Sequence, residues 1–314
     1  MLIIHSLRQY LLKRLNGLIL FTCLAMVATS VNAKATPGLE GQSVLVSVHP
    51  MALLIKSAWP ELEVSSLVSA NQSPHDFVLK PSDMSNIAAA DAVIWMGETF
   101  EPYLAKALRG QRQVDLSVTL DEADAHANDG QAGDEHENDE HADHHDHDAH
   151  IHDPHLWLDP NGIKKILSFV QSSLALPAPK AFIAQYDAWL SSAATTLIPH
   201  KDVGFVSFHD AFHAWVETFK LNQVAVVTSN PEKPVGTRHI VEVRNILASG
   251  QVQCLFVEPQ FQSRIVTKLH KGLSIKVINI DPMASKFLID EAGFINFYQS
   301  LLGSFTQCFS GPQD

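Results

Sequence analysis

Short apolar segments alternate with helical ones along most of the chain, and this alternation limits the fold more than any other feature. The apolar segments are bounded by helical or loop patterns, as strands of a buried sheet are. We predict strands at residues 43–48, 63–68, 93–97, 204–208, 223–228, 254–258 and 276–280. Strand–helix alternation is typical of parallel sheets with helices on both faces. The sequence therefore predicts an α/β fold with two parallel-sheet lobes.

One long amphipathic helix is predicted between the two groups of strands. Pro179 suits its first position and Pro199 ends it. Its apolar residues recur at spacings of three and four: Phe182, Tyr186, Trp189, Ala193 and Leu197. About 20 helical residues span roughly 30 Å, enough to run along both lobes, although an ordinary surface helix has the same periodicity. We expect an N-terminal lobe at 34–172, a linking helix at 173–200 and a C-terminal lobe at 201–314.

Residues 1–33 have the pattern of an export signal. Three basic residues precede a mostly apolar stretch at 15–31, and small residues end at Ala33. The apolar stretch is shorter than the roughly 20 residues that a membrane-spanning helix needs. We therefore predict cleavage after about Ala33 and export of a soluble protein.

The acidic residues are concentrated at 121–152. This segment contains 12 of the 34 Asp and Glu residues and eight of the 17 histidines, which leaves 22 acidic residues against 22 basic ones elsewhere. Without a basic patch, nucleic acid is not an expected partner. The composition predicts a disordered loop, which either is a solvated linker or binds divalent metal weakly. The candidate weak ligands are His136, His141, His144, His145, His147, His150 and His152.

Four potential metal ligands lie beside predicted strands or helices. His75 follows the second strand, His155 precedes a helix, and His209 and Asp281 each end a strand. Ligands of open α/β sheets bind at the carboxyl ends of strands, so these residues are expected to meet between the lobes. Three imidazoles and a carboxylate suit Zn²⁺. Spacing alone also fits solvated surface histidines, the interpretation preferred for His213.

Several runs in the sequence resemble one family. SPHDFVLKPSD, DPHLWLDP, FHDAF, FVEPQF and NIDP resemble the zinc-specific periplasmic solute-binding proteins of bacterial ABC transporters, the ZnuA type. The resemblance covers nearly the whole chain after the export signal. It implies two lobes bridged by a rigid helix, with the metal in a cleft between them. It also implies that His75, His155 and His209 are ligands and that Asp281 completes the site.

The same resemblance implies a function and a disulfide. The protein would capture Zn²⁺ in the periplasm as a monomer without enzymatic activity, and deliver it to a membrane permease driven by an ATPase. The sequence has no GxxxxGK[ST] motif, so the ATPase is expected to be a separate chain. Cys254 and Cys308 match a disulfide of a zinc-binding branch, and an even pair of cysteines in an exported protein favours the same bond.

Departures from the family pattern leave alternatives open. Pro74 stands where some zinc-binding members have Glu, so Asp281 or water is expected as the fourth ligand. Manganese and iron binders have a carboxylate at the position of His209, and imidazole there favours zinc. One alternative is a zinc-dependent hydrolase in which Asp281 is the general base. Another is a manganese- or iron-binding relative or an adhesin. His49, after the first strand, could also face the cleft, but a solvated histidine is the preferred interpretation.

Overall fold

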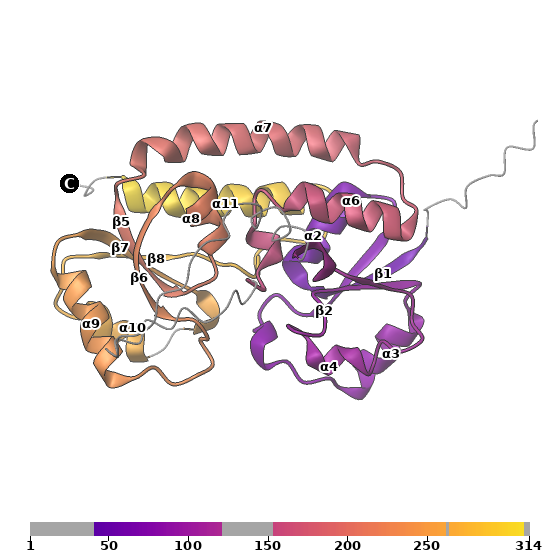
Figure 1. Ribbon diagram of the computed structural model, residues 1–314, viewed down its shortest axis with the longest axis horizontal. Coiled ribbons are helices and arrows are strands. Elements are labelled where there is room, and N and C mark those ends of the chain that lie inside the picture. Colours follow the sequence, from indigo (N-terminus) through magenta and orange to yellow (C-terminus); the bar gives the residue numbers. More distant parts are fainter. Residues whose placement is uncertain (1–40, 121–152, 262–263, 311–314) are drawn as a thin grey trace, which may run out of the picture. The chain divides into compact units, whose positions relative to one another are not determined.

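The computed structural model describes residues 41–120, 153–261 and 264–310 (Figure 1). The predicted export signal and the predicted weak ligands at 121–152 lie outside the described residues. The described residues all belong to one compact unit. Within the described ranges, no helix has both the length and the apolar character needed to cross a membrane.

Four parallel strands form the first sheet, in the order β2-β1-β3-β4. They are β1 (Ser43–Val48), β2 (Glu63–Val68), β3 (Ala92–Trp95) and β4 (Gln113–Asp115). The predicted bounds of β1 and β2 are confirmed, whereas β3 begins one residue earlier than predicted. The sequence prediction lacks β4, because a three-residue strand with one buried apolar residue, Val114, shows no readable alternation.

The second sheet repeats this topology, with four parallel strands in the order β6-β5-β7-β8. They are β5 (Gly204–His209), β6 (Asn222–Thr228), β7 (Val252–Val257) and β8 (Lys276–Asn279). All four were expected from the sequence, with bounds that differ by one or two residues. The predicted α/β fold with two parallel sheets is therefore confirmed.

Helices cover both faces of the first sheet. On one face, Val44 and Val46 of β1 pack in a core shared with α2 (His49–Ala58) and α6 (Ile163–Leu174). On the other, Leu45 packs in a second core with α3 (Pro81–Ala89) and α4 (Pro102–Ala105). Successive residues of β1 thus enter different cores, which explains why the strand is apolar without interruption.

Helix α3 begins at a proline, although the adjacent Ser82 is of a residue type that often caps helices. The helix begins at Pro81, so Ser82 already lies in its first turn. Asp83 instead accepts a hydrogen bond from the Lys80 backbone N–H through Oδ2, at 2.8 Å. Proline is favoured at the first helical position, and this preference decides where the helix begins.

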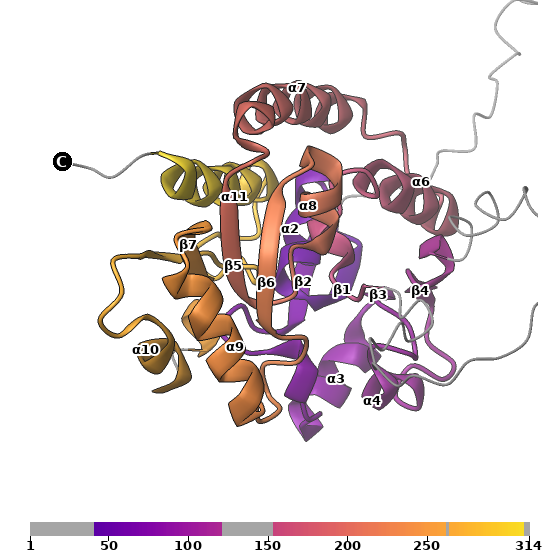
Figure 2. The same ribbon diagram turned by 60° about the vertical axis from the view of Figure 1, so that its left-hand side comes forward.

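The second sheet is covered in the same way. Val206 and Phe208 of β5 pack in the core that includes α9 (Thr237–Ala248) and α10 (Arg264–His270). The opposite face packs against α8 (His213–Phe219) and α11 (Gly293–Phe309). Figure 2 shows α3, α4, α9 and α10 on the side of the sheets away from α7.

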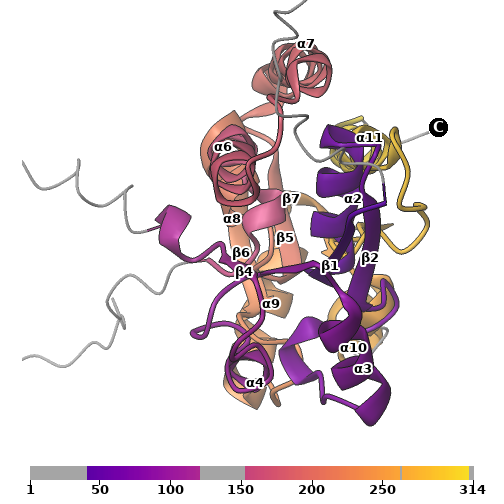
Figure 3. The ribbon, with the colours of Figure 1, turned by 90° about the vertical axis from the view of Figure 1, so that its right-hand side faces the viewer.

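The predicted long helix is α7 (Lys180–Leu197), and it begins one residue after Pro179, which is the N-cap. Its buried residues are the five that the sequence predicts: Phe182, Tyr186, Trp189, Ala193 and Leu197. Figures 1 and 3 show α6 and α11 between α7 and the strands. Tyr186 donates a hydrogen bond to the Pro160 carbonyl at 2.7 Å, and the Trp189 ring packs at a tilt against Trp215 of α8, with 5.8 Å between ring centroids. The helix therefore contacts elements beside both sheets.

The last helix, α11, also contacts elements beside both sheets, which the sequence does not predict. The Phe294 N–H donates to Ser57 Oγ of α2 at 3.2 Å, and Tyr298 Oη donates to the Trp157 carbonyl at 2.8 Å. Trp157 Nε1 in turn donates to the Pro282 carbonyl at 2.8 Å. Two helices, rather than one, thus connect the two sheets. The lobe boundaries given above, at residues 172 and 200, stay a prediction.

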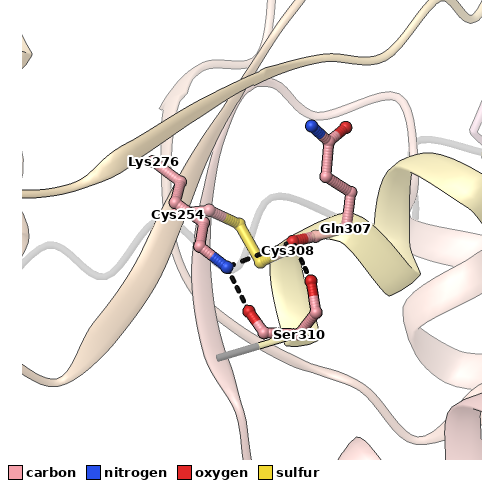
Figure 4. Close-up of a disulfide and its surroundings, with 5 residues drawn as sticks. All are labelled: Cys254, Lys276, Gln307, Cys308 and Ser310. Carbon is pink, nitrogen blue, oxygen red and sulfur yellow. Dashed lines mark hydrogen bonds between the residues drawn. A yellow bond between two sulfur atoms is a disulfide. The ribbon is translucent and has the colours of Figure 1, made fainter. Parts of the chain in front are cut away.

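The predicted disulfide between Cys254 and Cys308 is present. It joins β7 to α11, with 5.7 Å between the two Cα atoms, and both cysteines are fully buried. Figure 4 shows Lys276 of the neighbouring β8 beside it. The Lys276 ammonium donates hydrogen bonds to the carbonyls of Gln307 and Ser310 at the end of α11. A cation in this place also interacts favourably with the negative end of the helix dipole.

Candidate metal centre

Three of the four predicted ligands come together. The ring centroids of His75, His155 and His209 are 5.6, 5.2 and 5.0 Å apart in pairs, and one ligand nitrogen from each lies within 4.8 Å of the others. They come from the loop after β2, from the segment before η2 (Leu156–Leu158) and from the end of β5. Residues remote in sequence thus form one cluster of imidazoles.

His75 is the exposed member of this cluster. It lies in η1 (Pro74–Asp76), a single 3₁₀ turn that Pro74 opens and Ser73 caps. The cap is a hydrogen bond from the His75 N–H to Ser73 Oγ at 3.3 Å. Proline fixes its own φ and suits the first turn of a helix, so the sequence SPH is enough to form this turn. Local structure therefore contributes to the position of His75.

His155 is buried and held by a carboxylate. Asp153 Oδ1 accepts hydrogen bonds from the His155 backbone N–H at 2.9 Å and from its Nδ1 at 2.7 Å. The neighbouring Trp157 packs edge-on against the imidazole, with centroids 5.4 Å apart. An acceptor at Nδ1 keeps the proton on that nitrogen, which leaves Nε2 with its lone pair for a metal.

His209 repeats this arrangement in the second sheet. Its Nδ1 is 3.2 Å from Glu258 Oε1, and the two residues are only 3% and 2% exposed. Its Nε2 is buried and has no hydrogen-bond partner among the described residues. Buried polar atoms almost always have a partner, so an exception calls for an explanation. A metal ion bound to Nε2 would supply the missing partner.

The titration of His75 differs from that of a free histidine. Desolvation lowers the pKa of His75 to about 4, and repulsion from His155 and His209 contributes, while Asp153 acts in the opposite direction. A histidine in water titrates near pH 6.5. His75 therefore stays in its neutral, metal-binding form well below that pH. Protons therefore compete with a metal at this ring at a lower pH than at a free histidine.

Asp281 is not part of the three-histidine cluster, and its role as fourth ligand stays a prediction. Its Oδ1 accepts hydrogen bonds from Gln260 Nε2 at 2.8 Å and from the Met283 N–H at 3.0 Å. Its Oδ2 accepts from the N–H and Oγ of Ser285, at 2.7 and 2.6 Å. The carboxylate is thus fully engaged in ordering the loop that follows β8. Water, the other expected fourth ligand, is compatible with this arrangement.

The two histidines with open roles also lie outside the cluster. His49 Nε2 contacts the Phe287 carbonyl at 2.9 Å, and burial lowers the pKa of His49. His213 is exposed at the start of α8, so it does not share a helix with His209, the last residue of β5. The structure thus gives His49 a contact with the backbone and leaves His213 at the surface.

Sequence reasoning missed three residues that surround the imidazoles. Asp153 and Glu258 hold His155 and His209, and Gln260 lines the same pocket. The signals were present, since Asp153 lies two residues before a predicted ligand and the other two belong to the quoted run FVEPQF. The pocket has a cavity volume of about 10 Å³. That is space for one ion or one water molecule.

Removing the carboxylates that hold the imidazoles is expected to weaken metal binding. D153N and E258Q keep the side-chain shape but give Nδ1 a weaker acceptor, so we expect Zn²⁺ affinity to fall about 10- to 100-fold in each. Competition with a chromophoric chelator measures this change. D187N is the control, because Asp187 pairs with Lys164 on the surface at 3.0 Å. Unchanged affinity in both test variants would contradict the assigned roles.

Comparison with known proteins identifies similar sequences. The family model described as ZnuA, zinc-uptake complex component A periplasmic, matches residues 44–308. The chain is 31% identical over 308 residues to the high-affinity zinc uptake system protein ZnuA of Haemophilus ducreyi, with 91% of this chain and 97% of that protein covered. It is 27% identical to the Yersinia pestis protein of the same name, covering 90% and 96%.

Solved structures share the fold. A crystal structure of a ZnuA deletion mutant with zinc bound superposes with a TM-score of 0.65 at 19% sequence identity. The match covers 87% of this chain and all of that one. The arrangement of two parallel sheets is therefore common to both proteins.

Proposed function

Because the chain belongs to the ZnuA family of periplasmic zinc-uptake components, we propose that it captures Zn²⁺ in the periplasm and delivers it to a membrane permease for import. The observation that carries this proposal is the convergence of His75, His155 and His209 in one small pocket. The permease and its ATPase would be separate chains, and this protein would act as a monomer. The signal for export is proposed to be residues 1–33.

The donor set supports zinc as the ion. Three imidazoles suit Zn²⁺, which prefers four ligands in a tetrahedron, whereas Mn²⁺ and Ca²⁺ favour oxygen ligands and higher coordination numbers. Both buried imidazoles present Nε2, since carboxylates occupy their Nδ1 atoms. We propose that these three nitrogens bind the ion and that water takes the fourth position.

The size of the pocket supports binding rather than catalysis. Sites for organic substrates have volumes of about 300–1,000 Å³, compared with about 10 Å³ in the pocket of the three histidines. The hydrolase alternative also needs Asp281 as a free general base, but hydrogen bonds engage both of its oxygens. A protein that carries the ion without changing it accounts for both observations.

The three ligands differ in a way that suggests how zinc is taken up. His155 and His209 are buried and held by Asp153 and Glu258, so they form a preorganised pair. His75 is exposed and held by one local hydrogen bond. We propose that zinc first meets the buried pair and that the loop of His75 closes over it. Because α7 and α11 both connect the sheets, rearrangement of this loop is favoured over wide hinge motion.

Competition between metals tests the proposed function. Metal-free protein is titrated with Zn²⁺ in the presence and absence of excess Mn²⁺, and binding is followed by calorimetry. One tight Zn²⁺ site that a hundredfold excess of Mn²⁺ does not displace is expected. A preference for Mn²⁺ would overturn the assignment to zinc, and the absence of a tight site for either ion would overturn the carrier function.

The acidic segment at 121–152 is proposed to bind additional zinc weakly. Its interleaved histidines and carboxylates precede the ligand His155 by only a few residues, so ions that it holds are near the pocket. Deleting the segment is expected to lower the zinc stoichiometry while one tight site remains, as equilibrium dialysis with metal analysis would measure. If the stoichiometry is unchanged, the segment is a linker and does not collect zinc.

A further inference from the structure

Gln260 lies at the edge of the metal pocket without an assigned role. It belongs to η4 (Pro259–Phe261), directly after Glu258, and lines the pocket together with the three histidines. Its Oε1 is buried and accepts no hydrogen bond within the described residues. A buried carbonyl oxygen without a donor is unfavourable, so this atom is expected to have a partner when the site is loaded.

The orientation of the Gln260 amide is set by its other end. Nε2 donates to Asp281 Oδ1 at 2.8 Å and is 3.5 Å from the Ala70 carbonyl. Both neighbours are acceptors, so the nitrogen must lie on this side and the oxygen on the other. Asp281, whose own oxygens are fixed by Met283 and Ser285, therefore determines where Oε1 lies.

We propose that Gln260 Oε1 accepts a hydrogen bond from the water molecule that completes the zinc site, and that Asp281 positions Gln260 for this contact. The inference rests on the proposed function, in which three imidazoles leave one of four positions open. A metal-bound water has two O–H donors, and Oε1 is a pure acceptor. Gln260 thus accounts for the fourth position without a fourth protein ligand.

This contact would also select the chemistry of the fourth ligand. An amide oxygen attracts a neutral water molecule through its O–H group but repels an anion that presents only lone pairs. The pocket would therefore favour water over halide or azide on the bound ion. Exchangeable water is easily displaced when zinc is passed on, whereas a tightly held anion would block the position.

Azide titration of the Co²⁺-loaded protein tests the proposal, because the visible spectrum of Co²⁺ reports its ligands. In the wild type, azide is expected to replace water with a measurable Kd. Q260M removes the acceptor at nearly constant shape, and azide is expected to bind about tenfold more tightly, the effect of about one hydrogen bond. Q260K replaces the acceptor with a donor and should strengthen azide binding further.

Three controls separate this role from a structural one. Q72L makes a comparable change at Gln72, an exposed position in the loop before His75, and should leave the azide Kd unchanged. D281N should shift the Kd in the direction of Q260M. The double variant D281N/Q260M should have the same azide Kd as Q260M alone, since Asp281 acts through Gln260. Thermal unfolding of each metal-free variant shows whether it is folded.

The possible results are distinct. An azide Kd that is the same in wild type, Q260M and Q260K would overturn the proposal, and so would Co²⁺ spectra that azide changes in none of the three proteins. If Q260M does not fold, the ordering of wild type and Q260K still decides. A wild-type protein that binds neither Zn²⁺ nor Co²⁺ tightly would contradict the proposed function itself, whereas tight binding with an unchanged azide Kd contradicts only the role of Gln260.

Discussion

Replacing His209 with glutamine is expected to lower the affinity for Zn²⁺ by about two orders of magnitude. Zinc bound to four ligands in small domains is stabilised by about 10–16 kcal/mol, or roughly 3 kcal/mol for each ligand, which corresponds to about a hundredfold in Kd. His209 is the ligand candidate whose loss should be least compensated. It is 3% exposed, and its Nε2 has no alternative partner among the described residues.

Glutamine suits this experiment because its amide can still donate to Glu258 and so preserves the buried contact. Competition with a chromophoric chelator gives the Kd, and unfolding of the metal-free variant shows whether the fold is retained. H239Q is the control, since His239 is exposed on α9 and lies outside the cluster, whereas the charge of His213 acts on Asp153. Equal losses in both variants, or no loss in H209Q, would contradict the assignment of His209 as a ligand.

The features that the sequence predicts well depend on local patterns. The bounds of β1 and β2 follow from short apolar runs, and the buried face of α7 follows from spacings of three and four residues. The convergence of His75 and His209 follows from a topological rule, because ligands of parallel sheets meet at the carboxyl ends of strands, whereas His155 lies before η2 and the rule does not place it. Each of these predictions uses only residues that are close together in the sequence, together with the fold class.

The features that the sequence does not predict depend on long-range contacts. The hydrogen bond from Gln260 to Asp281 joins residues 21 positions apart, and periodicity does not reveal it. The attachment of α11 to α2 involves residues more than 230 positions apart, such as Ser57 and Phe294. Periodicity records which face of a helix is buried but not which elements cover it.

Removing the disulfide is expected to destabilise the protein by about 4 kcal/mol. The bond between Cys254 and Cys308 closes a loop with a sequence separation of 54. Its absence gives the unfolded chain additional conformations, and the chain-entropy relation assigns about 4 kcal/mol to a loop of this length. C254A/C308A is the appropriate variant, because both cysteines are fully buried and serine would leave two buried hydroxyls needing partners. Urea unfolding of the metal-free protein measures the difference.

The same variant separates stability from metal binding. The disulfide anchors the end of α11 to β7, whereas the three imidazoles are held by Asp153, Glu258 and the local turn at Ser73. In conditions where C254A/C308A is folded, we therefore expect its Zn²⁺ Kd to stay within about threefold of the wild type. Wild-type protein treated with a reductant lacks the disulfide but keeps both cysteines, so it is the control for the effect of the alanine side chains. A loss of zinc affinity comparable with that of H209Q would contradict this separation, because it would mean that the anchored end of α11 is needed to hold β5 and its terminal histidine in place.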